Sequence, residues 1–328
     1  MEARPVREFE SAPAVRTKVP LWIGLVGAAG SGKTMSALRL AMGMERVYGK
    51  GTFVIDTESR RSAHYADQFS FSLVDFKPPF GPLDYLAAIE HCVSKGAKII
   101  IIDSMSHEWE GQGGVLESHD VECDRLAKQW GSTRDKVQMT AWQRPKSEHR
   151  KLIQSMLQLG VNFVLCYRAR EKLKVIPGKA PQPLGWQPVA PDDVVFEATM
   201  NALLYPGSGG VPSWQPDEMG EKALVKLPGQ FKDIFATRAP LSEDIGAKLA
   251  TWAAGGTAPS KPANDAPTPP TNARLKDLNA LMEGQGVTEP AGKLAWISNR
   301  VGRPIKSSKE LTADEVEALL TERQPGQD

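Results

Sequence analysis

The stretch GAAGSGKT, residues Gly27 to Thr34, matches the phosphate-binding pattern GxxxxGK followed by serine or threonine. It lies between an apolar run, Leu21 to Val26, and a helix-like stretch that starts at Met35. In this pattern glycines let backbone N–H groups turn toward phosphate oxygens, the lysine reaches the β and γ oxygens, and the hydroxyl ligates Mg²⁺. The residues expected to bind the phosphates are Gly27, Ala28, Ala29, Gly30, Ser31, Gly32, Lys33 and Thr34. The sequence therefore predicts a site for a nucleoside triphosphate and Mg²⁺.

Beyond this loop, short apolar runs alternate with stretches of helical periodicity. The run KIIIID, Lys98 to Asp103, contains four isoleucines and is typical of a central strand that is buried on both faces. The other runs expected to be strands are Pro20 to Val26, Thr52 to Asp56, Phe71 to Phe76 and Asn162 to Tyr167. Strands that alternate with helices predict an α/β fold with a mostly parallel central sheet flanked by helices.

The pattern changes after these strands. Residues Phe196 to Tyr205 and Lys222 to Leu227 look like two strands joined by a glycine-rich turn, which predicts an antiparallel extension of the sheet. A helix from about Ser242 to Trp252 is expected to close the domain.

The chain is expected to have four parts. Residues 1–18 mix charges and should form a flexible arm, and residues 19–254 should form the core domain. Residues 255–272 are rich in proline, alanine and threonine, which predicts a disordered linker. Residues 273–328 return to helical periodicity, with a capping box at Thr312 and Glu315. A helical domain of roughly fifty residues is small for independent stability, so we expect it to rely on a partner.

Composition limits the classes of function. The 328 residues carry 40 Lys and Arg against 39 Asp and Glu, so a nucleic-acid contact would need a local basic patch. The three cysteines lack CxxC spacing. This indicates a protein of a reducing compartment that has neither a disulfide framework nor a zinc site. His119 and Cys123 lie one helical turn apart, but two candidate ligands do not make a metal site. No stretch approaches about 18 consecutive apolar residues, so a soluble, cytoplasmic protein without membrane contact is expected.

Carboxylates follow two of the expected strands. Asp103 ends the isoleucine run and is expected to hold Mg²⁺ through a water while Thr34 binds it directly; the alternative is a helix cap. Hydrolysis also needs a group that orients the attacking water, and two glutamates are candidates. Glu58 lies two residues after Asp56 in VIDTES, and Glu108 lies in SHEWEG just beyond Asp103.

Three segments carry a resemblance to RecA-type recombinases. TFVIDTESRRSAHYADQF resembles the strand and acidic turn that supply the catalytic glutamate, and IIIIDSMSHEW resembles the second nucleotide motif of that family. The resemblance makes Glu58 the preferred base, acting with Lys33. VNFVLCYRAREKLKV is similar to the strand that ends in a polar sensor, which implies that Arg168 and Arg170 sense the γ-phosphate. The alternative is an ordinary basic strand end, and the expected amide of the sensor is replaced by Tyr167 and Arg168.

A narrower resemblance covers about residues 20–255. The combination of IDTE, AHYAD, IDSMSHEWEGQGG and WQRPKSEHRKLI resembles phage-encoded ATPases with a single RecA-like core that are associated with annealing or recombination. It implies the cofactors ATP and Mg²⁺, ATP hydrolysis stimulated by single-stranded DNA, a single-strand-binding or annealing protein as partner, and the bacterial host cytoplasm as location. The segment ISNRVGRPIKSSKELTADEVEALL resembles a small helical module of phage and actinobacterial recombination proteins.

The resemblance implies two DNA-binding loops. One follows Asp103 and contains His107 and Trp109. The other runs from Lys172 to Asp193, where lysines and a tryptophan among prolines suit phosphate contact and base stacking. Its expected DNA-binding residues are Lys172, Lys174, Lys179 and Trp186. The alternative is a surface insertion whose tryptophan packs on its own domain.

The sequence leaves more than one possibility for the oligomeric form and for the activity. RecA-type proteins assemble head to tail with ATP between neighbours, and FESA at Phe9 to Ala12 matches the short FxxA pattern by which some recombinases dock. A homo-oligomer formed through the ATPase core is therefore expected, as a ring, a filament or another form. The competing functions are a P-loop kinase, whose lid would come from residues 104–145, and a nucleotide-regulated adaptor with negligible turnover.

Overall fold

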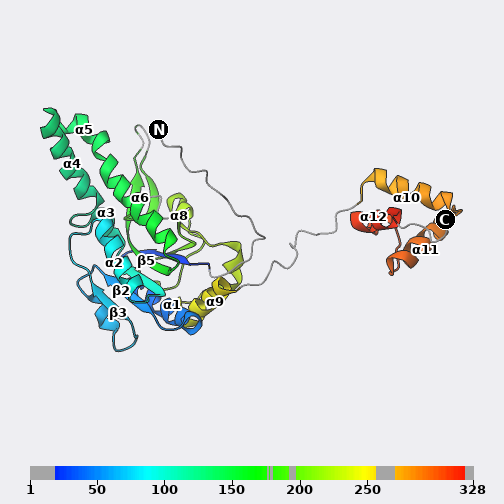
Figure 1. The fold of residues 1–328 in the computed structure, drawn as a ribbon, viewed down its shortest axis with the longest axis horizontal. Helices are drawn as coiled ribbons and strands as arrows, with labels where there is room; N and C mark the ends of the chain where they lie inside the picture. Colours follow the sequence, from blue (N-terminus) through cyan, green and yellow to red (C-terminus); the bar gives the residue numbers. More distant parts are fainter. Residues whose placement is uncertain (1–18, 176, 178–179, 192–196, 256–269, 322–328) are drawn as a thin grey trace, which may run out of the picture. The chain divides into compact units, whose positions relative to one another are not determined.

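The computed structural model describes residues 19–175, 177, 180–191, 197–255 and 270–321 (Figure 1). The chain divides into two compact units, Met1–Thr257 and Ala258–Asp328. The expected N-terminal arm with its FESA motif lies outside the described residues, as do most of the expected linker and Lys179.

The larger unit is built on a seven-stranded sheet with the order β3-β2-β4-β5-β1-β7, and β6 pairs with β5 beyond this path. The strands are β1 (Trp22–Gly27), β2 (Thr52–Asp56), β3 (Ser72–Asp75), β4 (Ile99–Asp103), β5 (Asn162–Lys174), β6 (Gln182–Pro188) and β7 (Met200–Leu204). All the pairings along the main path are parallel, and β6 is antiparallel to the outer half of β5. The mostly parallel α/β fold predicted from the sequence is confirmed.

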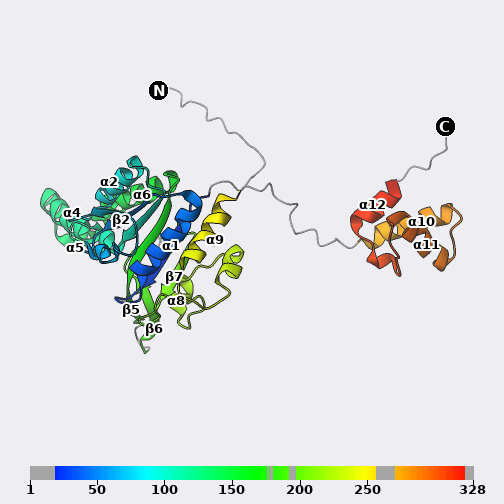
Figure 2. The same ribbon diagram turned by 90° about the horizontal axis from the view of Figure 1, so that it is seen from below.

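Helices cover both faces of this sheet, which explains the run of four isoleucines. Ile99 and Ile101 lie in one buried cluster with residues of α1 (Lys33–Tyr48) and α9 (Glu243–Ala254). Their neighbours Ile100 and Ile102 lie in a second cluster with residues of α2 (Pro82–Ser94) and α6 (Gln143–Gln158). Successive side chains of a strand point to opposite faces, so a strand covered on both sides is apolar throughout. Figure 2 shows α1 and α9 side by side on their face.

The register of the strands brings their carboxyl ends to one edge. Asp56 of β2 pairs with Asp103 of β4, and Gly27 of β1 pairs with Arg168 of β5. Ligands of open parallel sheets bind outside this edge. The phosphate loop, both strand-end aspartates and Arg168 therefore share one side of the molecule.

The segment after β4 is helical. It forms α3 (Ser106–Glu110), α4 (Val115–Trp130) and α5 (Arg134–Ala141) before α6 begins. A small buried cluster holds α4 and α5 together. The DNA-binding loop expected after Asp103 is thus a set of packed helices.

The expected antiparallel extension is reduced to isolated bridges. Strand β7 runs parallel to β1, and the first half of the segment expected as its partner, residues 222–224, belongs to the helix α8 (Met219–Leu224). Only an isolated antiparallel bridge joins Asn201 to Lys226. Leu224 is buried in the core cluster that also contains Phe163 and Leu165 of β5, so tertiary packing overrides the local strand-like pattern.

The smaller unit contains α10 (Asn272–Gly284), α11 (Pro290–Val301) and α12 (Ala313–Thr321) around a core of its own. The predicted capping box is confirmed: the Thr312 N–H donates to the Glu315 carboxylate (2.9 Å), and the Glu315 N–H donates to the Thr312 hydroxyl (3.1 Å). In the described parts of the chain, no helix combines the length and apolar character needed to span a membrane.

Candidate nucleotide-binding and catalytic site

The phosphate loop joins the end of β1 to the start of α1. Gly30 and Gly32 have positive φ angles of 73° and 90°, which glycine adopts without the cost that a side chain would add. The Ser31 hydroxyl donates to the carbonyl of Ala28 (2.9 Å) and closes the loop from within. The first N–H groups of α1 have no helical partner and carry the positive end of the helix dipole. The loop is therefore shaped to receive phosphate oxygens.

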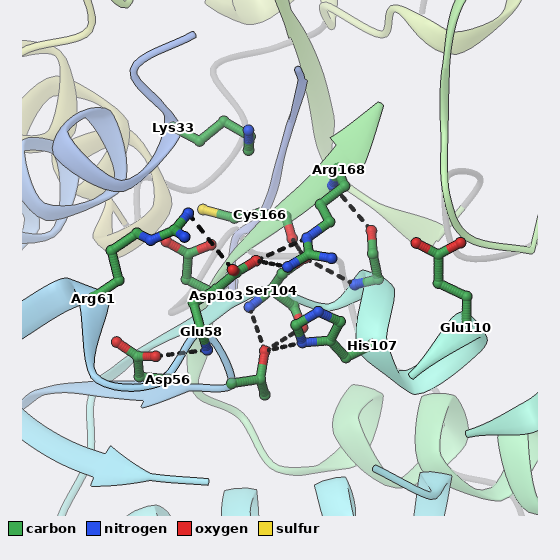
Figure 3. Close-up of polar contacts among 12 residues, drawn as sticks. Lys33, Asp56, Glu58, Arg61, Asp103, Ser104, His107, Glu110, Cys166 and Arg168 are labelled. Carbon is green, nitrogen blue, oxygen red and sulfur yellow. Dashed lines mark hydrogen bonds and ion pairs between the residues drawn. The ribbon is translucent and has the colours of Figure 1, made fainter. Parts of the chain in front are cut away.

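Lys33 extends back over this loop. Its ammonium donates to the carbonyls of Gly27 (2.8 Å) and Ala28 (2.7 Å). Burial lowers the pKa of Lys33, and the nearby Asp103 and Glu58 carboxylates oppose this effect. Figure 3 shows the Lys33 ammonium at the same edge of the sheet as Glu58 and Arg168. A cation is thus positioned between the loop and the catalytic candidates.

Thr34 and Asp103 lie in direct contact, so both could bind one metal ion. The Thr34 hydroxyl donates to the Asp103 carboxylate (2.5 Å). Burial raises the pKa of Asp103, while the hydrogen bond from Thr34 lowers it. Both supply the hard oxygen ligands that Mg²⁺ prefers, and Mg²⁺ usually binds one or two protein groups with substrate phosphates completing its shell. The residues present fit Mg²⁺, and these two would hold it.

The described part of the chain holds no larger metal cluster. In the described ranges, no group of three or more His, Cys, Asp and Glu side chains is placed to hold a metal ion. The Cys123 sulfur lies 3.6 Å from Nε2 of His119, whose ring stacks on Trp142. This distance is within hydrogen-bond range for sulfur.

Asp56 builds the acidic turn that carries Glu58. Its carboxylate accepts backbone N–H groups from Glu58 (2.7 Å), Arg60 (3.2 Å) and Ser62 (2.8 Å), as well as the Ser62 hydroxyl. Ser59 and Arg60 have positive φ angles of 58° and 63°, so the chain turns sharply after Glu58. This anchoring role of Asp56 was missed in the sequence, although an aspartate that ends a strand often bonds to the N–H groups that follow.

Glu58 is held by two arginines. Its carboxylate accepts the Nε–H of Arg168 (2.8 Å), and the Arg168 Nη2 lies 2.7 Å from the same oxygen. Arg61 lies 3.6 Å from the other oxygen (Figure 3). Burial alone would raise the pKa of Glu58, whose side chain is 11% exposed, but the hydrogen bond and charge of Arg168, with His107 and Arg61, lower it overall. Glu58 is therefore ionised at neutral pH.

A hydroxyl and imidazole pair lies directly beside Glu58. The Thr57 hydroxyl is 2.7 Å from Nδ1 of His107 and accepts the N–H of Ser104 (2.8 Å). The His107 ring stacks on Phe80 with a centroid distance of 5.2 Å. Burial and the charge of Arg168 lower the pKa of His107, which keeps it neutral at pH 7. His107 was expected in a DNA-binding loop, but in the structure it lies beside Glu58 at the candidate nucleotide site. Thr57, which the sequence did not single out, lies there too.

Glu108, the other candidate base, points away from this site. Its side chain is 1% exposed, and one carboxylate oxygen lies 2.8 Å from Nδ1 of the buried His149 on α6. The pair joins α3 to the helix layer. Because a base must reach a water beside the γ-phosphate, this position leaves Glu58 as the candidate.

The arginines of β5 have different surroundings. The backbone N–H of Arg168 donates to the Ser106 hydroxyl (2.9 Å), which fixes the middle of β5 beside Glu58. Arg170, two residues further along the same face, pairs with Glu110 (2.9 Å) and makes no contact with Glu58 or the loop. The structure thus places one of the two expected phosphate sensors at the site.

The second expected DNA loop is largely a hairpin. Lys172 and Lys174 are exposed on the outer half of β5. Trp186 on β6 is partly buried against the main core, and its backbone N–H donates to Glu221 (2.7 Å). This packing agrees with the alternative interpretation of the tryptophan. Trp109 is also engaged, since its ring stacks on Trp142 at 6.0 Å.

The fold and this site define the protein class: a P-loop NTPase with a mostly parallel α/β core. A family model described as an AAA domain matches residues 20–192, just over half of the chain, and the chain belongs to this family. Among solved structures, the KaiC-like protein PH0186 from the hyperthermophilic archaeon Pyrococcus horikoshii OT3 is 18% identical, with a TM-score of 0.31. The match covers 56% of this chain and 70% of that chain. Comparison with curated protein sequences gives no match.

Proposed function

We propose that this protein binds ATP with Mg²⁺ and hydrolyses it, with Glu58 orienting the attacking water. The observation that carries the proposal is the placement of an ionised Glu58 beside Arg168, on the same edge as the phosphate loop and the Thr34–Asp103 pair. A water-orienting carboxylate, a lysine and a metal pair are the parts that nucleotide hydrolysis requires.

Each residue has a part in this proposal. The loop N–H groups and Lys33 hold the phosphates, and Thr34 and Asp103 hold Mg²⁺, which when bound neutralises charge on the β and γ oxygens. Glu58 accepts a hydrogen bond from the water. Arg168 holds Glu58 in place and lies where its guanidinium can also contact the γ-phosphate.

The test is the variant Glu58→Gln, which keeps the size of the side chain and removes its charge. We expect turnover to fall by about two orders of magnitude or more while ATP affinity is retained. Steady-state turnover and calorimetric ATP binding measure the two effects. Glu110→Gln is the matched control, because Glu110 pairs with Arg170 and lies beyond the phosphate site. Unchanged turnover in Glu58→Gln would remove Glu58 from this role.

A second part of the proposal concerns single-stranded DNA, in phage recombination or replication. Arg168, Arg170, Lys172 and Lys174 occupy alternate positions of β5, so a basic row leads from the nucleotide site to the exposed hairpin. Among the residues that the structure describes, Lys172 and Lys174 have no ion-pair partner. A row of cations beside the site suits a phosphate backbone. Self-association through the ATPase core and a single-strand-binding or annealing partner belong to the same proposal.

ATP turnover with and without single-stranded DNA tests this second part. We expect stimulation at low salt that declines as salt rises, because phosphate contacts release counterions. The double variant Lys172→Glu with Lys174→Glu should lose the stimulation and keep the basal rate. A flat response at low salt overturns the DNA proposal. Turnover that instead depends on a small-molecule acceptor would indicate a kinase, and ATP binding without turnover would indicate an adaptor.

A further inference from the structure

The side chains that would contact the γ-phosphate all lie on one side of the phosphate loop. Glu58 follows β2, Asp103 ends β4 and Arg168 lies on β5, whereas β7 borders β1 on the opposite side. The γ-phosphate and the nucleoside are the two ends of one molecule. If the loop holds the triphosphate as proposed above, on which this inference rests, the nucleoside must extend toward β7 and the segment that follows it.

The segment after β7 is in direct contact with the phosphate loop. A Cβ atom on Gly32 would lie 3.1 Å from the backbone nitrogen of Gly210, and one on Gly210 would lie 2.8 Å from the Ser36 hydroxyl. The Gly210 carbonyl accepts the N–H of Leu241 (3.0 Å), which ties the segment before α9 to the same turn. Gly210 and Leu241, the two ends of the segment 210–241, therefore lie beside the phosphate loop on the β7 side.

Residues 212–215 and 235–239 of this segment line an open cavity of about 700 Å³, within the range of small-ligand sites. Trp214 and Phe235 form its aromatic part, with ring centroids 4.8 Å apart at 63°. Gln215, Thr237 and Arg238 also line the cavity and are exposed. Gln215 and Arg238 make no hydrogen bond or ion pair with any other described residue. The cavity thus combines an aromatic surface with a donor–acceptor amide and a guanidinium that have no partner among the described residues.

We propose that this cavity holds the nucleobase of the bound nucleoside triphosphate. Trp214 contacts the ring, and Gln215 and Arg238 hydrogen-bond to its polar edge. Flat aromatic ligands with polar edges are bound by this combination of groups. A second cavity of about 410 Å³, lined by Thr57, Ser59 and Lys77 among others, lies on the Glu58 side of the loop. It borders the γ-phosphate end and is therefore not the base site.

The test separates the base from the phosphates. Calorimetry on the full chain with Mg²⁺ would compare ATP with inorganic tripolyphosphate, which has no base. We expect Trp214→Leu to weaken ATP binding about tenfold, the effect of removing an aromatic partner from a base, and to leave tripolyphosphate binding unchanged. The double variant Gln215→Ala with Arg238→Ala should act in the same direction, and it alters exposed side chains that the fold does not need. Trp130→Leu, at the exposed C-terminal end of α4, is the matched control and should change neither affinity.

A photo-cross-linking experiment on the unmodified chain gives an independent readout. We expect 8-azido-ATP to label the peptide that contains residues 212–239. Unchanged ATP affinity in both cavity variants, equal losses for ATP and tripolyphosphate, or labelling outside this peptide would overturn the inference. If the chain binds neither ATP nor tripolyphosphate, the proposed nucleotide function itself fails.

Discussion

The contacts of Glu58 with Arg168 affect both its pKa and the availability of its oxygens. Arg168 lowers the pKa of the carboxylate and at the same time occupies one of its oxygens with two contacts, at 2.7 and 2.8 Å. An ionised carboxylate is the form that accepts a hydrogen bond from water. Arg168 therefore tunes the group that the proposed reaction depends on.

Replacing Arg168 tests this tuning through pH dependence. Glu58 acts in its deprotonated form, and Arg168 lowers its pKa, so Arg168→Ala should raise that pKa. The loss of turnover on acidification should then occur at higher pH than in the unmodified protein. The pH profile of kcat measures the shift. Arg170→Ala is the control, because Arg170 pairs with Glu110 and should leave the profile in place. An acid limb at the same pH in both variants would contradict this role.

At the scale of elements, α1 and α9 pack closely because glycines lie at their contact. A Cβ on Gly246 of α9 would overlap the Leu40 carbonyl of α1, and one on Gly43 would overlap the Glu243 carbonyl. Outside this contact, Arg39 and Glu243 join the same helices with a bidentate ion pair (2.9 to 3.1 Å). The helix that starts at the phosphate loop is thus braced by the helix that ends the larger unit.

Gly246→Ala should therefore destabilise the larger unit. Because a methyl group must be inserted against backbone, we expect the free energy of unfolding to fall by about 1–3 kcal/mol. Chemical denaturation measures this change. Gly229→Ala is the control: a Cβ there meets no atom within 4 Å, and its effect should stay within about 0.5 kcal/mol. Equal stabilities of the two variants would contradict the close packing.

The capping box of α12 gives a second prediction at this scale. Thr312→Ala removes the hydroxyl that accepts the Glu315 N–H and should lower the stability of the smaller unit by about 1 kcal/mol. Hydrogen exchange of the α12 amides in the full chain should become faster. Thr312→Ser keeps the hydroxyl and should preserve the slow exchange. The same rate in all three proteins would show that the cap does not stabilise α12.

At the scale of the whole molecule, the two units have separate cores. Every described residue of the candidate site belongs to the larger unit, while α10, α11 and α12 surround the other core. We therefore expect deletion of residues 256–328 to leave ATP binding and basal turnover intact. DNA-stimulated turnover and recruitment of a partner should decline instead. A collapse of ATP binding after the deletion would show that the smaller unit is needed by the site.

Much of the fold could be predicted from the sequence because the patterns that specify it are local. The phosphate loop, the isoleucine strand and the capping box each depend on residues within a few positions of one another, and all three appear in the structure. The segment Lys222 to Leu227 was misjudged because its strand-like pattern is overridden by burial of Leu224. The hairpin of β5 and β6 was expected as a loop because its pairing depends on residues beyond the strand itself.

The sequence by itself determined that this chain has a phosphate-binding loop, an aspartate at the end of the isoleucine strand and a mostly parallel sheet, since spacing and periodicity encode these features directly. The resemblance already favoured Glu58 over Glu108 as the base, and the tertiary structure shows how differently the two glutamates are placed. Glu58 and Arg168 are 110 residues apart and meet because β2, β4 and β5 end at one edge. Glu108 is turned into the interior by its contact with His149, 41 residues away. Contacts over such separations arise from strand order and helix packing, which no local pattern specifies.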